Sequence, residues 1–127
     1  MTKTATATNE KGTFVIRLHR ALRAGVHHDL HLDGESWAVP KFVPTTASQG
    51  RRLAIKTAYH TPEQTHFEGD IPEGQYGAGK SEVVDEGEYI VISSSPEYVF
   101  FQLHGNTYRG NYQLRHWRED NWLLRKK

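Results

Sequence analysis

Short β-prone runs separated by turn residues constrain the fold of this chain more than any other feature of its sequence. The runs are rich in Val, Ile, Tyr, Phe and Trp, which favour extended backbone. Gly, Asn and Asp occupy the gaps, as at Asp33-Gly34, Glu86-Gly87 and Gly105-Asn106, and they suit tight turns. Only Arg20–Ala24 resembles a helix, and it is brief. The sequence therefore predicts a mainly β protein, a compact antiparallel β-barrel with at most short helices. The expected strands are 14–18, 26–32, 36–39, 52–58, 80–85, 89–93, 98–103, 108–114 and 121–124.

The length and composition bound the organisation of the chain. Its 127 residues suit one domain, so we expect a flexible tail over 1–12 and a single β-barrel domain over 13–127. The tail is rich in Thr and Ala and has no apolar periodicity. The sequence has neither a membrane-spanning run nor a secretory signal, which predicts an intracellular, cytoplasmic protein without a membrane partner. We also expect a monomer.

The stretch His27-His28-Asp29-Leu30-His31 carries the strongest chemical signal. Alternate side chains of a strand share a face, so His27, Asp29 and His31 are expected to lie side by side. His19, on the preceding strand, can approach the same place. The chain has no cysteine, so a metal must be held by nitrogen and oxygen ligands. Imidazoles and a carboxylate suit a divalent transition ion such as Mn²⁺ or Zn²⁺.

The overall charge does not by itself indicate a nucleic-acid partner. The formal net charge is only +1, which is too small for that conclusion. Local groups of cations are a better guide, and they occur before the histidine-rich strand, after it and at the end of the chain. These groups are Arg17, Arg20 and Arg23; Lys41, Arg51, Arg52 and Lys56; and Arg115, Arg118, Arg125, Lys126 and Lys127.

Several segments are specific when taken together and in this order. They are His19, His27-x-Asp29, Ser36–Lys41 (SWAVPK), Arg52–Ala54 (RLA), His60, Phe67–Gly79 (FEGDIPEGQYGAG), Leu103–Gly105, Arg109–Leu114 and Trp122–Leu124. This arrangement resembles the 3′-phosphoesterase domain of bacterial DNA ligase D and its stand-alone relatives, over about residues 14–124. The glycine-rich part of the long motif, 71–79, is interpreted as a tightly turning loop that shapes the barrel.

The resemblance implies a Mn²⁺-dependent barrel that trims 3′ ends of DNA or RNA–DNA primer-templates, with Zn²⁺ or Co²⁺ as other possible metals. Such a nuclease removes 3′-ribonucleosides and 3′-phosphates before ligation in non-homologous end joining. By the family's pattern, His19, His27 and Asp29 bind the metal. His60 lies at the scissile phosphate as a catalytic residue, and Lys41 and Arg52 clamp that phosphate. A DNA ligase and an end-binding protein are the expected partners in trans.

Two positions depart from the family's pattern, and both lie where the family handles phosphate. His31 stands in place of an arginine, and Gln64 stands in place of a tyrosine. Histidine replaces the fixed charge of arginine only in part, so removal of a terminal phosphate is the step most affected. His31 is also a further candidate metal ligand, because it shares a face with His27 and Asp29. Two alternatives stay open: an end-binding module with little or no catalysis, and a metal-storing barrel unrelated to nucleic acid.

Overall fold

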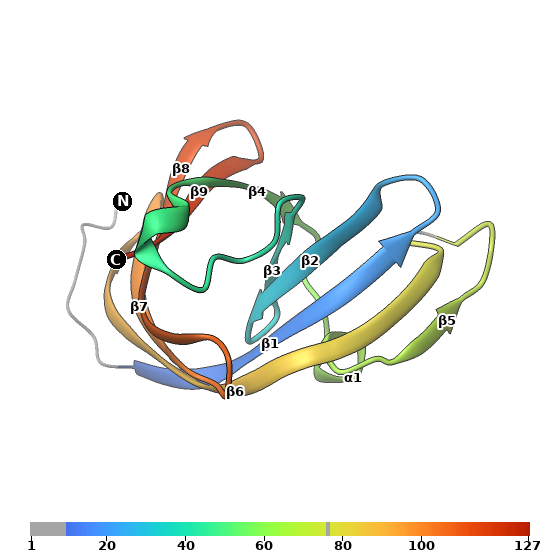
Figure 1. Ribbon diagram of the computed structural model, residues 1–127, viewed down its shortest axis with the longest axis horizontal. Helices are drawn as coiled ribbons and strands as arrows, with labels where there is room; N and C mark the ends of the chain where they lie inside the picture. The colour runs from blue at the N-terminus through green and yellow to red at the C-terminus, as the bar shows by residue number, and fades with distance from the viewer. Residues whose placement is uncertain (1–9, 76) are drawn as a thin grey trace.

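One continuous antiparallel sheet forms the body of the protein (Figure 1). The computed structural model describes residues 10–75 and 77–127. In those ranges none of the helices is long and apolar enough to cross a membrane. The strands are β1 (Glu10–Ala21), β2 (Gly25–Leu32), β3 (Glu35–Val39), β4 (Arg52–Thr57), β5 (Gly69–Ile71), β6 (Gly79–Ser95), β7 (Tyr98–His104), β8 (Arg109–Arg118) and β9 (Asn121–Lys126), and the helices are η1 (Ala47–Gln49) and α1 (Pro62–Thr65).

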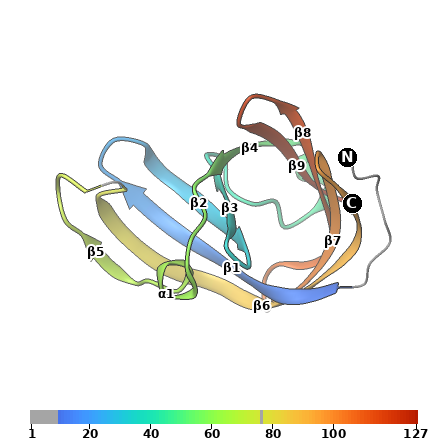
Figure 2. The same cartoon turned by 180° about the vertical axis from the view of Figure 1, so that it is seen from behind.

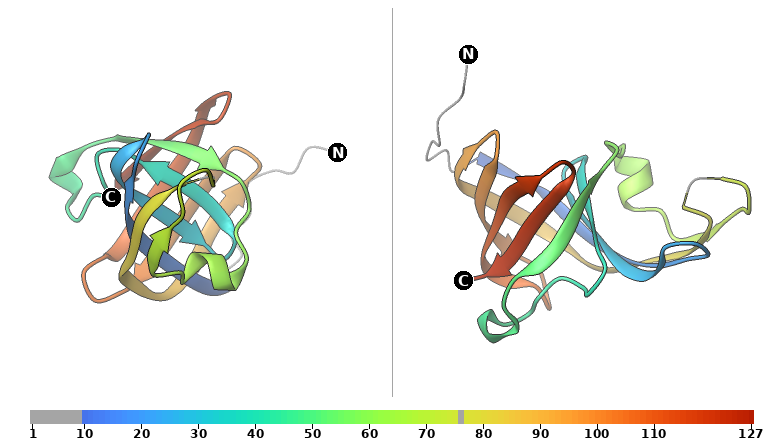
Figure 3. Two further views of the ribbon diagram at one scale, coloured as in Figure 1. Left: turned by 90° about the vertical axis from the view of Figure 1, so that its right-hand side faces the viewer. Right: turned by 90° about the horizontal axis from the view of Figure 1, so that it is seen from above.

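The sheet closes on itself. Its strand order is β1-β2-β3-β4-β9-β8-β7-β6-β5, and an additional antiparallel pairing of β1 with β6 completes a ring of eight strands in the described part of the chain. The short β5 pairs only with the first residues of β6 and lies outside that ring. Figure 3 shows the ring from its end and from above. The prediction of a mainly β, antiparallel barrel is confirmed.

Two predictions from the sequence are wrong near the start of the chain, one about the end of the tail and one about a short helix. Strand β1 begins at Glu10, so the last three residues of the expected 1–12 tail are strand, because they pair with Tyr89–Val91 of β6. Residues 1–9 lie outside the described residues. The segment Arg20–Ala24 is not helical, since it forms the end of β1 and the turn into β2. Pairing between strands overrides the weak local preference for helix.

The expected turn at Glu86-Gly87 is also absent, because 80–85 and 89–93 belong to one long strand, β6. Gly87 has a packing role there. A Cβ atom at this position would lie 2.4 Å from the carbonyl oxygen of His104 and 3.2 Å from the ring of Phe14. The glycine therefore allows β6 to approach both neighbours closely, a use of glycine that local sequence does not distinguish from a turn.

The inside of the barrel is apolar. Phe14, Ile16 and Leu30, at even-numbered positions of β1 and β2, are fully buried in it together with Phe101, Leu114 and other large side chains from most of the strands. Odd-numbered positions of β1 and β2 therefore face outward, as alternation along a strand requires. Around Arg17, His19, His27 and Asp29 this outward face is not open to solvent, however, because another part of the chain covers it.

The cover is the segment between β4 and β6, which carries α1 and β5 (Figure 2). The backbone of His60 donates a hydrogen bond to the carbonyl of Gly34 at 2.9 Å, and the hydroxyl of Ser81 donates to the carbonyl of Phe67 at 3.1 Å. These bonds hold the segment against β2, β3 and β6. Polar side chains that point outward from β1 and β2 are consequently buried beneath a loop rather than solvated.

Candidate metal centre

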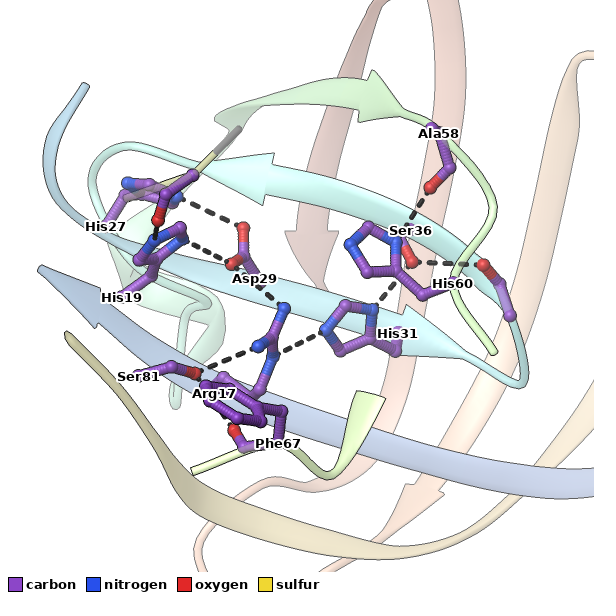
Figure 4. Close-up of polar contacts among 12 residues, drawn as sticks. Arg17, His19, His27, Asp29, His31, Ser36, Ala58, His60, Phe67 and Ser81 are labelled. Atoms are coloured by element: carbon purple, nitrogen blue, oxygen red, sulfur yellow. Dashed lines mark hydrogen bonds and ion pairs between the residues drawn. The ribbon is translucent and has the colours of Figure 1, made fainter. Parts of the chain in front are cut away.

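The outward side chains of β1 and β2 form a row of polar groups beneath that cover (Figure 4). The antiparallel register places His19 opposite His27 and Arg17 opposite Asp29. Side chains of directly paired residues lie on the same face of a sheet, so these four converge. The sequence-predicted approach of His19 to the His27-x-Asp29 pair is therefore observed, and it follows from the pairing of neighbouring strands.

The carboxylate of Asp29 lies between two imidazoles. Its Oδ2 atom is 2.9 Å from Nδ1 of His19, and its Oδ1 atom is 3.1 Å from Nε2 of His27. Among the described residues, His19, His27 and Asp29 form a group whose ligand atoms all lie within 4.8 Å of one another. Two nitrogens and a carboxylate oxygen at this separation form a donor set suited to a divalent transition metal.

Backbone carbonyls orient both imidazoles. Nε2–H of His19 donates to the carbonyl of Gly77 at 2.6 Å, and Nδ1–H of His27 donates to the carbonyl of Gly25 at 3.1 Å. Each bond occupies one ring nitrogen as a donor, so the other nitrogen, which faces Asp29, is the one available to a metal. Metal-binding histidines are commonly oriented in this way. The three residues therefore fit a metal ion in tautomer as well as in position.

The glycine-rich segment contributes directly to this orientation. Gly77 has φ of +77°, a backbone conformation that favours glycine, and a Cβ atom there would lie 3.2 Å from Cε1 of the His19 ring. The segment 71–79, interpreted from sequence as a loop that shapes the barrel, thus also supplies the carbonyl that fixes the His19 ring.

Asp29 and His27 shift each other's pKa values. Burial alone would raise the pKa of Asp29, but hydrogen bonds from His19 and His27 and the nearby charges hold that pKa well below its usual range. Burial also opposes the charge on His27, yet the hydrogen bond and the charge of Asp29 outweigh it and raise the pKa of His27. The carboxylate is therefore ionised at neutral pH, as a metal ligand must be.

Arg17 lies at the candidate site, although the sequence did not predict it there. From sequence, Arg17 was only one member of a local group of cations. Only 4% of its surface is exposed, and its Nη2 atom lies 3.5 Å from Oδ2 of Asp29. Its Nη1–H donates to the hydroxyl of Ser81 at 2.9 Å, and its Nε–H donates to Nε2 of His31 at 3.0 Å. The pairing of β1 with β2 could have indicated this role, because it places Arg17 directly opposite Asp29.

His31 does not belong to the group formed by His19, His27 and Asp29 in this structure. It is fully buried, its Nε2 atom accepts from Arg17, and its Nδ1–H donates to the hydroxyl of Ser36 at 2.6 Å. Burial and the charge of Arg17 lower the pKa of His31 to about 3, so the ring is neutral. Both ring nitrogens are occupied, which leaves neither for a metal or a phosphate. In this structure His31 thus contacts Arg17 and Ser36, and its expected roles as a further ligand and phosphate contact stay predictions.

His60 belongs to the covering segment between β4 and α1 and lies next to His31. Its ring centroid is 4.9 Å from that of His31, and its Nδ1–H donates to the carbonyl of Ala58 at 2.7 Å. Burial lowers the pKa of His60 despite that carbonyl. The neutral ring therefore presents Nε2 as its unprotonated nitrogen. The structure thus brings His60, which sequence reasoning placed at the scissile phosphate, to the same covered face as the metal cluster.

The expected phosphate clamp of Lys41 and Arg52 lies apart from this row. The guanidinium of Arg52 donates to the carbonyl of Lys41, and the Lys41 side chain is exposed. Within the described residues, neither side chain forms a hydrogen bond or ion pair with His19, His27 or Asp29. The structure joins the two residues to each other, and their role as a phosphate clamp stays a prediction.

Gln64, another expected phosphate contact, is used locally. Its side-chain carbonyl accepts from the backbone N–H of Thr61 at 2.8 Å, and the Thr61 hydroxyl accepts from the backbone N–H of Gln64 at 3.3 Å. This reciprocal pair caps the first turn of α1. In this structure the side-chain oxygen of Gln64 therefore stabilises the short helix instead of facing the site.

Known proteins are similar to this chain over most of its length. A family model described as the DNA Ligase D 3′-phosphoesterase domain matches residues 17–116. The multifunctional non-homologous end joining DNA repair protein LigD of Mycobacterium tuberculosis strain H37Rv is 41% identical over 122 residues, which cover 91% of this chain and 16% of that protein. The multifunctional non-homologous end joining protein LigD of Mycolicibacterium smegmatis is 36% identical over 133 residues, covering 93% and 17%.

A more distant relative agrees with these two. The multifunctional non-homologous end joining protein LigD of Pseudomonas aeruginosa is 34% identical over 108 residues, which cover 80% of this chain and 13% of that protein. The chain thus spans about a sixth or less of the length of these relatives. The match includes the strands that hold His19, His27 and Asp29, and these residues lie together as a metal site requires. The chain belongs to the family of DNA ligase D 3′-phosphoesterase domains.

Proposed function

We propose that this protein is a metal-dependent phosphoesterase that processes 3′ ends of DNA or RNA–DNA primer-templates, removing 3′-ribonucleosides and 3′-phosphates in DNA repair by non-homologous end joining. Its family and the names of its relatives support a hydrolytic, end-processing role. Mn²⁺ is the proposed metal, and a DNA ligase and an end-binding protein are the proposed partners. The cytoplasm is the proposed location, and a single-domain monomer is the proposed form of 13–127.

The grouping of His19, His27 and Asp29 is the observation that carries this proposal. His19, His27 and Asp29 present two nitrogens and a carboxylate, and the carbonyls of Gly77 and Gly25 orient both rings for metal binding. A divalent ion held there would supply Lewis acidity, which polarises a phosphoryl group and lowers the pKa of a bound water. Hydrolysis of a phosphoester then needs no covalent nucleophile, which agrees with a chain that has no cysteine.

Arg17 and His60 perform the remaining tasks beside the cluster. Arg17 places a permanent positive charge next to Asp29, where it stabilises negative charge on the non-bridging oxygens of a phosphate. His60, held through its Nδ1–H, presents an unprotonated Nε2 that would accept a proton from the attacking water and could then pass that proton to the leaving oxygen. Arg17 also supplies from β1 the guanidinium that position 31 lacks, so removal of a terminal phosphate is retained in this proposal.

Lys41 and Arg52 are proposed to contact the substrate phosphate from outside the row. Lys41 follows β3, and its side chain is exposed. Its backbone carbonyl accepts a hydrogen bond from the guanidinium of Arg52. A long, flexible cation can reach a bound phosphate that it does not touch in the free protein. This proposal comes from the family's pattern, and Gln64 and His31 are assigned supporting roles in place of the phosphate contacts first expected.

The test is a 3′-end assay with Mn²⁺ on two labelled primer-templates, one ending in a ribonucleotide and one in a 3′-phosphate. The proposal expects the wild-type protein to shorten the first and dephosphorylate the second. Substitution His27→Ala should abolish both reactions. The matched control is His104→Ala, because His104 is an exposed histidine at the end of β7.

Mn²⁺ binding is measured separately by isothermal titration, so that a loss of metal and a loss of chemistry are distinguished. Activity on the ribonucleotide alone would locate the deficit in terminal-phosphate binding and would contradict the role given to Arg17. Tight binding of the primer-template with no reaction, while Mn²⁺ is bound, would favour the non-catalytic end-binding module. Absence of Mn²⁺ binding would contradict the metal site itself.

A further inference from the structure

A second polar surface lies on the outer wall of the barrel, where β4, β8 and β9 meet. A shallow hollow of about 260 Å³ is present there, and most of its lining is cationic. None of the residues that line it is acidic, and none belongs to the metal cluster. The lining residues are Arg51, Gln113, Arg115, Leu123, Arg125 and Lys127.

The strand register explains why the arginines gather. Arg125 of β9 lies directly opposite Gln113 of β8, and Arg115 lies opposite Leu123, so Arg115 and Arg125 are diagonal neighbours on one face. The residue after Arg51 pairs with Leu124. Arg51 therefore continues the same face on the other side of β9. Three positive groups from three neighbouring segments are placed within a few side-chain lengths of one another.

Among the residues that the structure describes, ion pairs do not neutralise these charges, because none of the pairs includes Arg51, Arg115, Arg125 or Lys127. The guanidinium of Arg115 instead lies over the Tyr98 ring, 4.9 Å from its centre. Like charges on adjacent strands destabilise a sheet, whereas a bound polyanion would offset that cost. The gathering is notable in a chain with a net charge of only +1.

We propose that this arginine face binds the phosphate backbone of the duplex that leads to the 3′ end, a proposal that rests on the proposed function for the identity of its ligand. Guanidinium groups donate two parallel hydrogen bonds to a phosphate, and three of the four cations are arginine. Contacts of this kind position a duplex without reading its sequence. That property suits an enzyme that must accept ends of any sequence.

The geometry also sets how long the duplex must be. Cross-strand pairs lead from Asp29 to Ala38, then to Ile55 and then to Asn121, all on the outward face. Three strand steps and the four residues from Asn121 to Arg125 place the arginine face about 20 Å from Asp29 along the barrel wall. This path covers three of the eight strand steps around the ring, so at a rise of about 3.4 Å per base pair a duplex needs at least about six base pairs to reach the arginine face.

The test measures binding by fluorescence anisotropy, in EDTA, to labelled DNA hairpins with the same 3′ end. The stems have 4 or 12 base pairs, are rich in G·C and are closed by an uncharged polyethylene glycol linker, so that only the longer stem reaches the arginine face. The variants are Arg115→Gln/Arg125→Gln and Arg125→Gln alone. The matched control, Lys11→Gln/Arg109→Gln, removes the same charge from exposed positions outside the hollow.

We expect the wild-type protein to bind the 12-base-pair stem at least about tenfold more tightly than the 4-base-pair stem. The Arg115→Gln/Arg125→Gln variant should lose most of that preference. Its slope of log Kd against log salt should fall by about two, because each lost phosphate contact removes about 0.9. Arg125→Gln alone should lose about half as much slope, while the control should retain the wild-type preference and slope. Melting curves by circular dichroism verify that each variant is folded.

Three results would overturn the proposal: equal affinity for the two stems, an equal loss in the control variant, or displacement of the 12-base-pair stem by poly-glutamate as effectively as by unlabelled DNA. The last result would assign the face to an acidic protein instead. The Mn²⁺-dependent assay on the 4-base-pair stem separates this proposal from the proposed function. If no variant is active there, the proposed function fails, while the anisotropy data still decide whether the arginine face binds a duplex.

Discussion

The two faces of the β1–β2 hairpin treat the same type of residue in opposite ways. On the inner face, His28 packs 4.5 Å from the Phe42 ring, and its Nδ1 accepts from the backbone N–H of Val43 at 2.9 Å. Burial lowers the pKa of His28 to about 4, so it is a neutral core residue. On the outer face, the neighbouring His27 lies against Asp29, which raises its pKa. A difference of one position along a strand therefore separates a structural histidine from a candidate ligand.

The outer face is itself divided. His27 and His31 both point outward, yet His27 lies with a carboxylate and His31 lies with a guanidinium. Burial and the charge of Arg17 lower the pKa of His31, whereas the hydrogen bond and charge of Asp29 outweigh burial and raise the pKa of His27. The comparison shows that sharing a face is necessary for a metal site but is not sufficient.

The largest effect is expected from Asp29→Asn, which removes the charge that defines the outer face. The amide keeps the shape of the carboxylate but cannot supply an anionic ligand, so Mn²⁺ affinity should fall by more than about 100-fold. Isothermal titration measures the affinity. Asp33→Asn is the control, because Asp33 accepts hydrogen bonds from Thr13 and Tyr89 outside the cluster. Wild-type Mn²⁺ affinity in Asp29→Asn would show that the cluster is an ion-pair network only.

Arg17→Gln should separate metal binding from phosphate handling. The variant removes a positive charge near Asp29, so Mn²⁺ affinity should stay equal or rise, while kcat/KM for 3′-end release should fall by about 10- to 100-fold. Titration and steady-state kinetics are measured on the same preparation. Arg20→Gln, the next arginine of β1, is the matched control. A parallel fall in Mn²⁺ affinity and activity would instead mean that Arg17 merely supports the position of Asp29.

His28→Leu should affect stability rather than metal binding. The change leaves the buried N–H of Val43 without its acceptor, which costs about 1–3 kcal/mol of unfolding free energy. His28→Asn, whose amide oxygen can accept that bond, should restore part of the loss. Urea unfolding provides the free energies, and Mn²⁺ titration should give wild-type affinity for both variants. A large loss of Mn²⁺ affinity in His28→Asn would remove the distinction between the two faces.

The smallest effect is the pH dependence of stability in the metal-free protein. In the folded protein the pKa values of His28 and His31 are lowered from the ordinary 6.5 to about 4 and about 3. Between these values and 6.5 the unfolded chain therefore binds more protons than the folded protein does. Stability should therefore rise with pH up to about 6.5 and be lost as pH falls toward 4. Urea unfolding at several pH values measures the slope, to which the raised pKa of His27 contributes in the opposite sense. His28→Asn should show a shallower slope, and an unchanged slope would mean that His28 is not held neutral.

Most of the strands and the grouping of His19, His27 and Asp29 could be predicted from local patterns. Period-two alternation placed His27 and Asp29 on one face, and turn residues bounded most of the strands. The errors have physical reasons. Glu86-Gly87 has the composition of a turn, but Gly87 is needed for close packing against His104 and Phe14. The 20–24 segment has helix-forming residues, but strand pairing overrides their preference.

The sequence by itself determined the β-barrel class, the family and the residues available as ligands, because these depend on residue types and short-range spacing. Only the tertiary structure decided what each polar residue does. His31 turns to Arg17 because β1 lies beside β2 in a particular register, and Gly77 reaches His19 from 58 residues away along the chain. Burial beneath the β4–β6 segment then sets the charge of each group. Desolvation and charge pairing depend on distances in space, which spacing along the chain does not contain.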